Sequence, residues 1–155
     1  MNIYPPFCVE RTINFTENNQ FKTILVYGLD SFEGFPEPNE FDDSSRNPKK
    51  GEWSHSPSGK YQYSEDFIQE IFKRASVSQE NLKLIKGFFN KTTLNLKSEN
   101  LKIGILHLDG DLYDSIKDPL LNLSDQVVEG GFIVFDDFIL RSDSNDDFPG
   151  SRKAY

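Results

Sequence analysis

Two short acidic motifs are the part of the sequence best suited to chemistry. Asp109 and Asp111 lie in HLDGDLYDS, and Asp136 and Asp137 lie in VFDDF. Carboxylates that are packed together raise one another's pKa unless a positive charge lies among them. Hard divalent cations such as Mg²⁺ or Ca²⁺ prefer oxygen ligands. The four aspartates therefore predict a divalent-metal site, provided that the fold brings the two motifs together.

The elements around these motifs predict how that could happen. Residues 102–108 (KIGILHL) are typical of a buried strand, residues 115–128 of a helix, and residues 132–135 of a second buried strand. Strands joined in this way are usually parallel and often adjacent, about 4.8 Å apart. Each aspartate pair follows the carboxyl end of its strand, where open α/β sheets bind ligands. A plainer interpretation is that such acids are helix caps or loop residues, and we prefer it for Asp114 and Asp118.

The rest of the chain predicts the same fold class. Residues 23–28 and 82–86 are strand candidates, and an apolar face with helical spacing follows the N-cap candidate Ser64. Strands alternating with helices indicate an α/β fold, Rossmann-like and doubly wound, with a mainly parallel sheet. We expect one domain over residues 1–155. Residues 36–60, rich in proline and glycine, are predicted to form a loop or lid.

Composition excludes several classes of partner. The net charge of -8 argues against a nucleic-acid or anionic-membrane surface, which would need a basic face. No apolar run approaches the length that spans a membrane. Cys8 is the only cysteine, so no internal disulfide is possible, and a cytoplasmic location is the default expectation.

Four stretches together resemble the macrocin O-methyltransferase (TylF-type) family of S-adenosylmethionine-dependent enzymes. They are YGLDSFEGFPEP at 27–38, IKGFFNKTTL at 85–94, ILHLDGDLYDS at 105–115, and GGFIVFDDF at 130–138 followed by GSRKA at 150–154. The resemblance covers about residues 23–155. It implies transfer of a methyl group from a sulfonium to a hydroxyl of a sugar or glycosylated metabolite, with Mg²⁺ or another divalent cation holding and acidifying that hydroxyl.

The resemblance also assigns roles by position. Asp109, Asp136 and Asp137 match the family's metal ligands. Asp111 matches the proposed general base, although the division of roles between Asp109 and Asp111 stays open.

Other positions follow the same comparison. Asp30, assisted by Ser31, is expected to bind the cofactor ribose. Trp53 and His55 are candidate contacts to the acceptor, whereas His107 is interpreted as a core residue. Relatives suggest a homo-oligomer.

The sequence departs from the family at both ends. The family begins with a strand and a glycine-rich turn that holds the cofactor's methionine end, but no glycine precedes Gly28. That first strand lies in the middle of the family's sheet, and two more strands should follow Tyr155. Three explanations compete: a fragment, a degenerate relative that no longer binds cofactor, or a divergent replacement strand around residues 7–13. We favour a fragment or truncated relative.

Two other function classes stay in view. A D-x-D glycosyltransferase would bind a nucleotide-sugar with Mn²⁺ and would have no use for Asp30. A non-catalytic remnant or interaction module would tolerate Asp136→Asn fully.

The absent glycine-rich turn generates a first prediction. The 155-residue chain alone is expected to bind S-adenosylmethionine weakly or not at all, because the turn that would hold the methionine end is missing. Calorimetric titration measures this directly, and binding in the micromolar range would contradict the prediction.

Overall fold

The computed structural model describes residues 8–12, 25–56, 58–76, 79–136 and 147–155. These residues form one five-stranded sheet with the order β3-β2-β1-β4-β5. The strands are β1 (Cys8–Thr12), β2 (Leu25–Asp30), β3 (Leu82–Lys86), β4 (Ile103–Leu108) and β5 (Val127–Phe135). The helices are α1 (Glu65–Arg74), α2 (Phe89–Lys97), α3 (Tyr113–Leu123) and α4 (Pro149–Lys153), with 3-10 turns η1 (Glu40–Asp42), η2 (Gln79–Asn81) and η3 (Ser124–Gln126). The α/β class with parallel strand pairs is confirmed.

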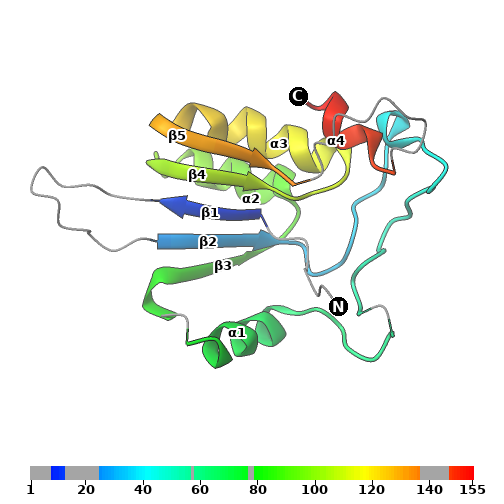
Figure 1. The fold of residues 1–155 in the computed structure, drawn as a ribbon, viewed down its shortest axis with the longest axis horizontal. Coiled ribbons are helices and arrows are strands. Elements are labelled where there is room, and N and C mark those ends of the chain that lie inside the picture. Colours follow the sequence, from blue (N-terminus) through cyan, green and yellow to red (C-terminus); the bar gives the residue numbers. More distant parts are fainter. Residues whose placement is uncertain (1–7, 13–24, 57, 77–78, 137–146) are drawn as a thin grey trace, which may run out of the picture.

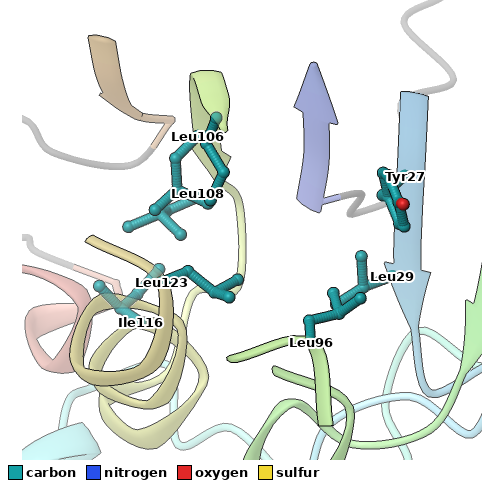
Figure 2. Close-up of a cluster of buried hydrophobic side chains, with 8 residues drawn as sticks. Tyr27, Leu29, Leu96, Leu106, Leu108, Ile116 and Leu123 are labelled. Atoms are coloured by element: carbon teal, nitrogen blue, oxygen red, sulfur yellow. The ribbon is translucent and has the colours of Figure 1, made fainter. Parts of the chain in front are cut away.

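The core lies between the sheet and the pair α2 and α3. Figure 2 shows Leu29 of β2 facing Leu96 of α2, and the leucines of β4 facing Ile116 and Leu123 of α3. These side chains are almost completely buried. Removing each from water contributes roughly 1.5–3 kcal/mol. Their packing fixes the two helices against one face of β2 and β4.

The centre of the sheet differs from our expectation. We favoured a chain without its central strand, but β1 occupies that place, as the replacement-strand alternative supposed. It runs antiparallel to both β2 and β4, whereas β2–β3 and β4–β5 are parallel (Figure 1). Only residues 13–24 separate β1 from β2.

One helix was predicted with the wrong bounds, and another was not predicted. The helix predicted over 115–128 begins at Tyr113 and ends at Leu123, and β5 begins at Val127. The β-branched pair at 127–128 favours strand, and Gly130 and Gly131 lie inside β5, where Gly130 has a φ of +81°. We did not predict α2, because its threonines and asparagines are weak helix formers.

Residues 31–56 form a folded segment at the carboxyl ends of the strands. The backbone of Phe35 pairs with residues 51–52, with Phe35 N–H donating to Glu52 O at 2.9 Å and Gly51 N–H donating to Phe35 O at 3.0 Å. Gly34, with a φ of +77°, lies directly against the backbone of residues 51–52, which leaves no room for a Cβ. Its function as a lid stays a prediction.

Asp42 attaches this segment to the start of α3. Its carboxylate is 3% exposed and accepts hydrogen bonds from Tyr113 N–H at 2.7 Å and Asn39 N–H at 2.9 Å. Leu112, at the N-cap position, provides no side-chain cap, so Asp42 caps the helix from a distant part of the chain. Gly150 of α4 packs on the same carboxylate. In the parts of the chain that the structure describes, none of these helices is long and apolar enough to span a membrane.

The Asp42 cap generates a stability prediction. Asp42→Ala leaves two backbone N–H groups without their acceptor, one of them at a helix start, and should lower the free energy of unfolding by about 1–3 kcal/mol. Urea denaturation measures the change. Asp43→Ala is the matched control, because Asp43 is the next residue and its own side chain is exposed. Equal effects of the two substitutions would contradict the capping role.

Candidate functional site

A cavity of about 530 Å³ lies at the carboxyl ends of β2, β3 and β4. Its floor comes from the residues that follow these strands, and its walls come from α1, α3 and the 31–63 segment. The lining includes Asp30 and Ser31 after β2, Phe88, Phe89 and Asn90 after β3, and Asp109, Gly110 and Asp111 after β4. The wall residues include Phe35, Glu37, Lys50, Glu52, Trp53, Tyr63, Ile68, Asp114, Lys117 and Asp118. The cavity therefore joins two of the predicted motifs.

The turn after β4 is tight and strained. A Cβ on Gly110 would lie 2.7 Å from the Ser115 Cβ, so only glycine allows α3 to pack this close to the turn. Asp111 has a φ of +57° and is 3% exposed. A left-handed non-glycine residue costs roughly 1–3 kcal/mol and persists only where its surroundings fix it, often at functional sites. The backbone thus holds the Asp111 carboxylate at the cavity.

The two aspartate motifs follow adjacent strands, as predicted. Leu108 and Phe135 are paired in the parallel register, and Asp136 N–H donates to Leu108 O at 3.0 Å. The Asp136 side chain is 58% exposed, is not among the residues lining the cavity, and lies 3.7 Å from His107 Nε2 through Oδ1. His107 itself is half-buried, not enclosed in the core.

The described residues do not form a complete set of metal ligands. Asp137 lies outside the described residues. Among the residues that are described, no three His, Cys, Asp or Glu side chains are grouped as a metal would require. The predicted metal site therefore stays a prediction, supported by the adjacency of the two backbones.

Asp30 ends β2 with its carboxylate held in a turn. Its Oδ1 accepts the Phe32 N–H at 2.5 Å. Burial raises the pKa of Asp30 to about 6, and the Phe32 hydrogen bond opposes this shift only in part. The Ser31 hydroxyl donates to Gly34 O at 2.9 Å and accepts from Glu33 N–H at 3.1 Å, so it stabilises the same turn. Both residues line the cavity.

The two predicted acceptor contacts are placed differently. Trp53 lines the cavity and is 42% exposed. His55 is not among the lining residues; its Nδ1 lies 2.9 Å from Ser54 Oγ, and its backbone pairs with Gln62. Sequence reasoning found Trp53, but missed the aromatic side chains of Phe88 and Phe89. Their signal was the family-like stretch at 85–94, in which they directly follow Gly87.

Asp114 belongs to a polar network on the wall. It accepts hydrogen bonds from Lys117 Nζ at 2.5 Å and from Asn39 Nδ2 at 2.9 Å. The Lys117 ammonium lowers the pKa of Asp114, and burial raises the pKa of Asp118. We expected helix caps or loop acids at both positions, but neither supplies the cap of α3, which comes from Asp42.

Comparison with known proteins now identifies the family. The model of the family "Macrocin-O-methyltransferase (TylF)" matches residues 13–153. The chain belongs to this family. Among curated relatives, demethyldecarbamoylnovobiocin O-methyltransferase of Streptomyces niveus is 30% identical over 115 residues, covering 74% of this chain and 42% of that protein. Mycinamicin III 3''-O-methyltransferase of Micromonospora griseorubida is 26% identical over 115 residues, covering 74% of this chain and 44% of that protein.

Two solved methyltransferase structures have the same fold. The O-methyltransferase NovP matches with a TM-score of 0.58 and 26% identity, over 83% of this chain and 48% of that chain. The calicheamicin methyltransferase CalS11 matches with a TM-score of 0.65 and 20% identity, over 83% of this chain and 49% of that chain. The chain thus spans less than half the length of these relatives.

The burial of Asp30 generates a pH prediction. An ordinary Asp ionises near pH 3.8, whereas folded Asp30 ionises near 6, so the folded state binds more protons between these values. The free energy of unfolding therefore falls as pH rises from about 4 to 6. Above pH 6 the ionised Asp30 destabilises the folded state to its full extent. Asp30→Asn keeps an acceptor for Phe32 N–H and should raise the free energy of unfolding by about 1–3 kcal/mol at neutral pH.

Urea denaturation across this pH range checks the sign. The difference between Asp30→Asn and wild type should be near zero at about pH 4 and should grow towards pH 6. Asp43→Asn, in which the same change is made at an exposed side chain, provides the control. If the difference in the free energy of unfolding between Asp30→Asn and wild type stays constant with pH, burial does not raise the pKa of Asp30.

Proposed function

We propose that the protein to which this chain belongs is an S-adenosylmethionine-dependent O-methyltransferase acting on a hydroxyl of a sugar or glycosylated metabolite. The observation that carries the proposal is that one cavity is lined by both Asp30 and the Asp109–Asp111 turn. A cofactor bound beside Asp30 and a hydroxyl beside Asp111 would then share one enclosed space. The match to the TylF family over residues 13–153 supports the same reaction.

The proposed step is a displacement at a methyl carbon. The acceptor oxygen forms a bond to the methyl group, the carbon–sulfur bond breaks, and the sulfur keeps its electron pair, which leaves S-adenosylhomocysteine. The acceptor hydroxyl gives up its proton, and Asp111 is the base that would take it. Its fixed, left-handed backbone supports this role, because a base must be held within reach of the proton it removes.

Asp109, Asp136 and Asp137 would hold a divalent cation such as Mg²⁺. Their oxygens are the ligand type that hard cations prefer, and the Leu108–Phe135 pairing places Asp109 and Asp136 side by side along the backbone. Asp136 would have to turn from His107 to join Asp109. When bound, the cation supplies Lewis acidity that lowers the pKa of the acceptor hydroxyl.

The charge of the cavity favours particular ligands. Its lining includes seven acidic residues, Asp30, Glu37, Glu52, Asp109, Asp111, Asp114 and Asp118, and two lysines, Lys50 and Lys117. An acidic lining attracts a cationic sulfonium and repels an anionic acceptor. We therefore assign an uncharged, hydroxyl-rich acceptor to this site. Trp53, one of the loop residues that line the cavity, is the side chain we assign to the apolar face of this acceptor.

One observation favours the second candidate, a non-catalytic remnant. Cys8 pairs with Leu29, so the amino end of β1 lies at the cavity edge of the sheet. In a parallel central strand, a turn following the carboxyl end would lie there and could hold the cofactor. Among the residues that the structure describes, the antiparallel β1 is followed by no such turn at this edge. No observation favours the glycosyltransferase alternative, because the family match is to methyltransferases.

The general-base assignment gives the decisive prediction. In the full-length protein, Asp111→Asn should lower kcat for methyl transfer by about 100-fold or more, because the amide cannot accept the hydroxyl proton at neutral pH. The S-adenosylmethionine Kd should stay within about twofold, since Asp111 acts on the acceptor. Radiolabelled methyl transfer to a panel of neutral glycosides measures the rate, and calorimetry measures the Kd.

Asp43→Asn is the matched control, because it makes the same change at an exposed side chain that is not among the residues lining the cavity. Its kcat should stay close to that of wild type. Chelation of divalent cations should abolish wild-type turnover, and Mg²⁺ should restore it. Equal activity of wild type, Asp111→Asn and Asp136→Asn would contradict the assigned roles, and absence of turnover together with absence of cofactor binding would favour the remnant.

A further inference from the structure

Arg46 lies behind the aromatic wall of the cavity. Its Cζ is 5.6 Å from the ring centroid of Phe35, 5.1 Å from that of Trp53 and 4.7 Å from that of Phe148. The three rings also pack on one another, with centroids 4.9–5.9 Å apart. Phe35 and Trp53 line the cavity, whereas Arg46 and Phe148 are not among its lining residues. The guanidinium therefore holds the wall from the side away from the ligand space.

Glu52 fixes the guanidinium in this position. Arg46 Nη1 lies 2.7 Å from Glu52 Oε2, and this hydrogen bond is the main cause that lowers the pKa of Glu52. A planar guanidinium can stack on aromatic rings and bond a carboxylate in its own plane at the same time, which an ammonium cannot do. Glu52 also lines the cavity and accepts the Phe35 N–H through its backbone. Arg46 thus connects to three residues of the wall.

Trp53 requires such support. Its φ of +65° lies in the left-handed region, which is strained for a residue with a bulky side chain. The turn that contains it is tight, with Glu52 N–H donating to Lys49 O at 3.1 Å and Ser54 N–H donating to Gly51 O at 3.4 Å. A strained residue keeps its conformation only when its neighbours over-determine it. The contacts of the indole with Arg46, Phe35 and Phe148 provide that constraint.

We infer that Arg46 is a positioning residue for the acceptor: it sets the indole face of Trp53 and thereby the affinity of the cavity for an uncharged glycoside. The inference rests on the proposed function for the identity of the ligand. It does not require contact between Arg46 and substrate, cofactor or reacting atoms. Cofactor affinity should be independent of Arg46, since Asp30 and the residues after β3 belong to other parts of the lining.

The test uses Arg46→Met in the full-length protein, which removes the charge and keeps an unbranched side chain. Trp53 is the only tryptophan of this sequence. Replacing by phenylalanine any tryptophan that the tested protein has elsewhere isolates the fluorescence of Trp53. Quenching by 4-nitrophenyl α-L-rhamnopyranoside, a neutral aryl glycoside, gives the Kd of the acceptor probe. We expect this Kd to rise about tenfold, or about 1.4 kcal/mol, which lies between an exposed and a fully desolvated cation–π contact. The Kd of S-adenosylhomocysteine should change less than about twofold.

Two further variants separate positioning from general stability. Arg74→Met makes the same change at the exposed Arg74–Glu70 pair on α1 and should leave both Kd values and the Trp53 emission unchanged. Arg46→Lys keeps a cation among the rings and should recover part of the lost glycoside affinity, and it carries the comparison if Arg46→Met does not fold.

The outcomes are distinct for the two proposals. Absence of quenching in the wild-type background, equal glycoside Kd values for Arg46→Met and Arg74→Met, or equal loss of glycoside and S-adenosylhomocysteine affinity would overturn the role of Arg46. Failure of S-adenosylhomocysteine to bind, with glycoside binding that still depends on Arg46, would instead contradict the methyltransferase proposal and leave the positioning role intact.

Discussion

The site depends on one constraint: β2 and β4 must point in the same direction across the strand that separates them. β1 is antiparallel to each of them, and two antiparallel pairings in series restore a common direction. Neighbouring strands lie about 4.8 Å apart, so the ends of β2 and β4 are separated by roughly 10 Å. This gap is where Asp30 and Asp109 face a common cavity. A central strand of either direction would keep β2 and β4 this far apart. Its carboxyl end would lie beside the cavity if it were parallel to them, whereas the amino end of the antiparallel β1 lies there.

The 31–56 segment converts this gap into an enclosed space. Asp42 connects it to the first turn of α3, and Gly150 of α4 packs against the same carboxylate. The Arg46 guanidinium packs against Phe148, which precedes α4. Two attachments therefore hold one wall of the cavity, one through a helix cap and the other through an aromatic cluster. The first joins residues 71 positions apart in the sequence, and the second joins residues about 100 positions apart.

The sequence predicted what depends on local pattern and on strand ends. The apolar runs gave β3 and β4 nearly to the residue, and the position of each aspartate pair after its strand gave the adjacency of the two motifs. The direction of β1 was not predictable, because a five-residue strand has no periodic signal that distinguishes a parallel neighbour from an antiparallel one. The Asp42 cap and the Arg46 cluster were also missed, since they are long-range contacts that no local motif encodes. Ser31 and Trp53 were predicted as contacts, and the structure adds that their positions come from turns with constrained backbones.

The distribution of strain supports a single interpretation of the cavity. Three of its lining residues, Phe32, Trp53 and Asp111, have left-handed backbones without being glycine. Each costs roughly 1–3 kcal/mol, which is a large fraction of the stability of a small domain. Burial of Asp30, whose pKa is raised to about 6, adds a further cost at neutral pH. Strain and buried charge gathered around one cavity are typical of a site shaped for a ligand, because packing alone would favour residues that relieve them.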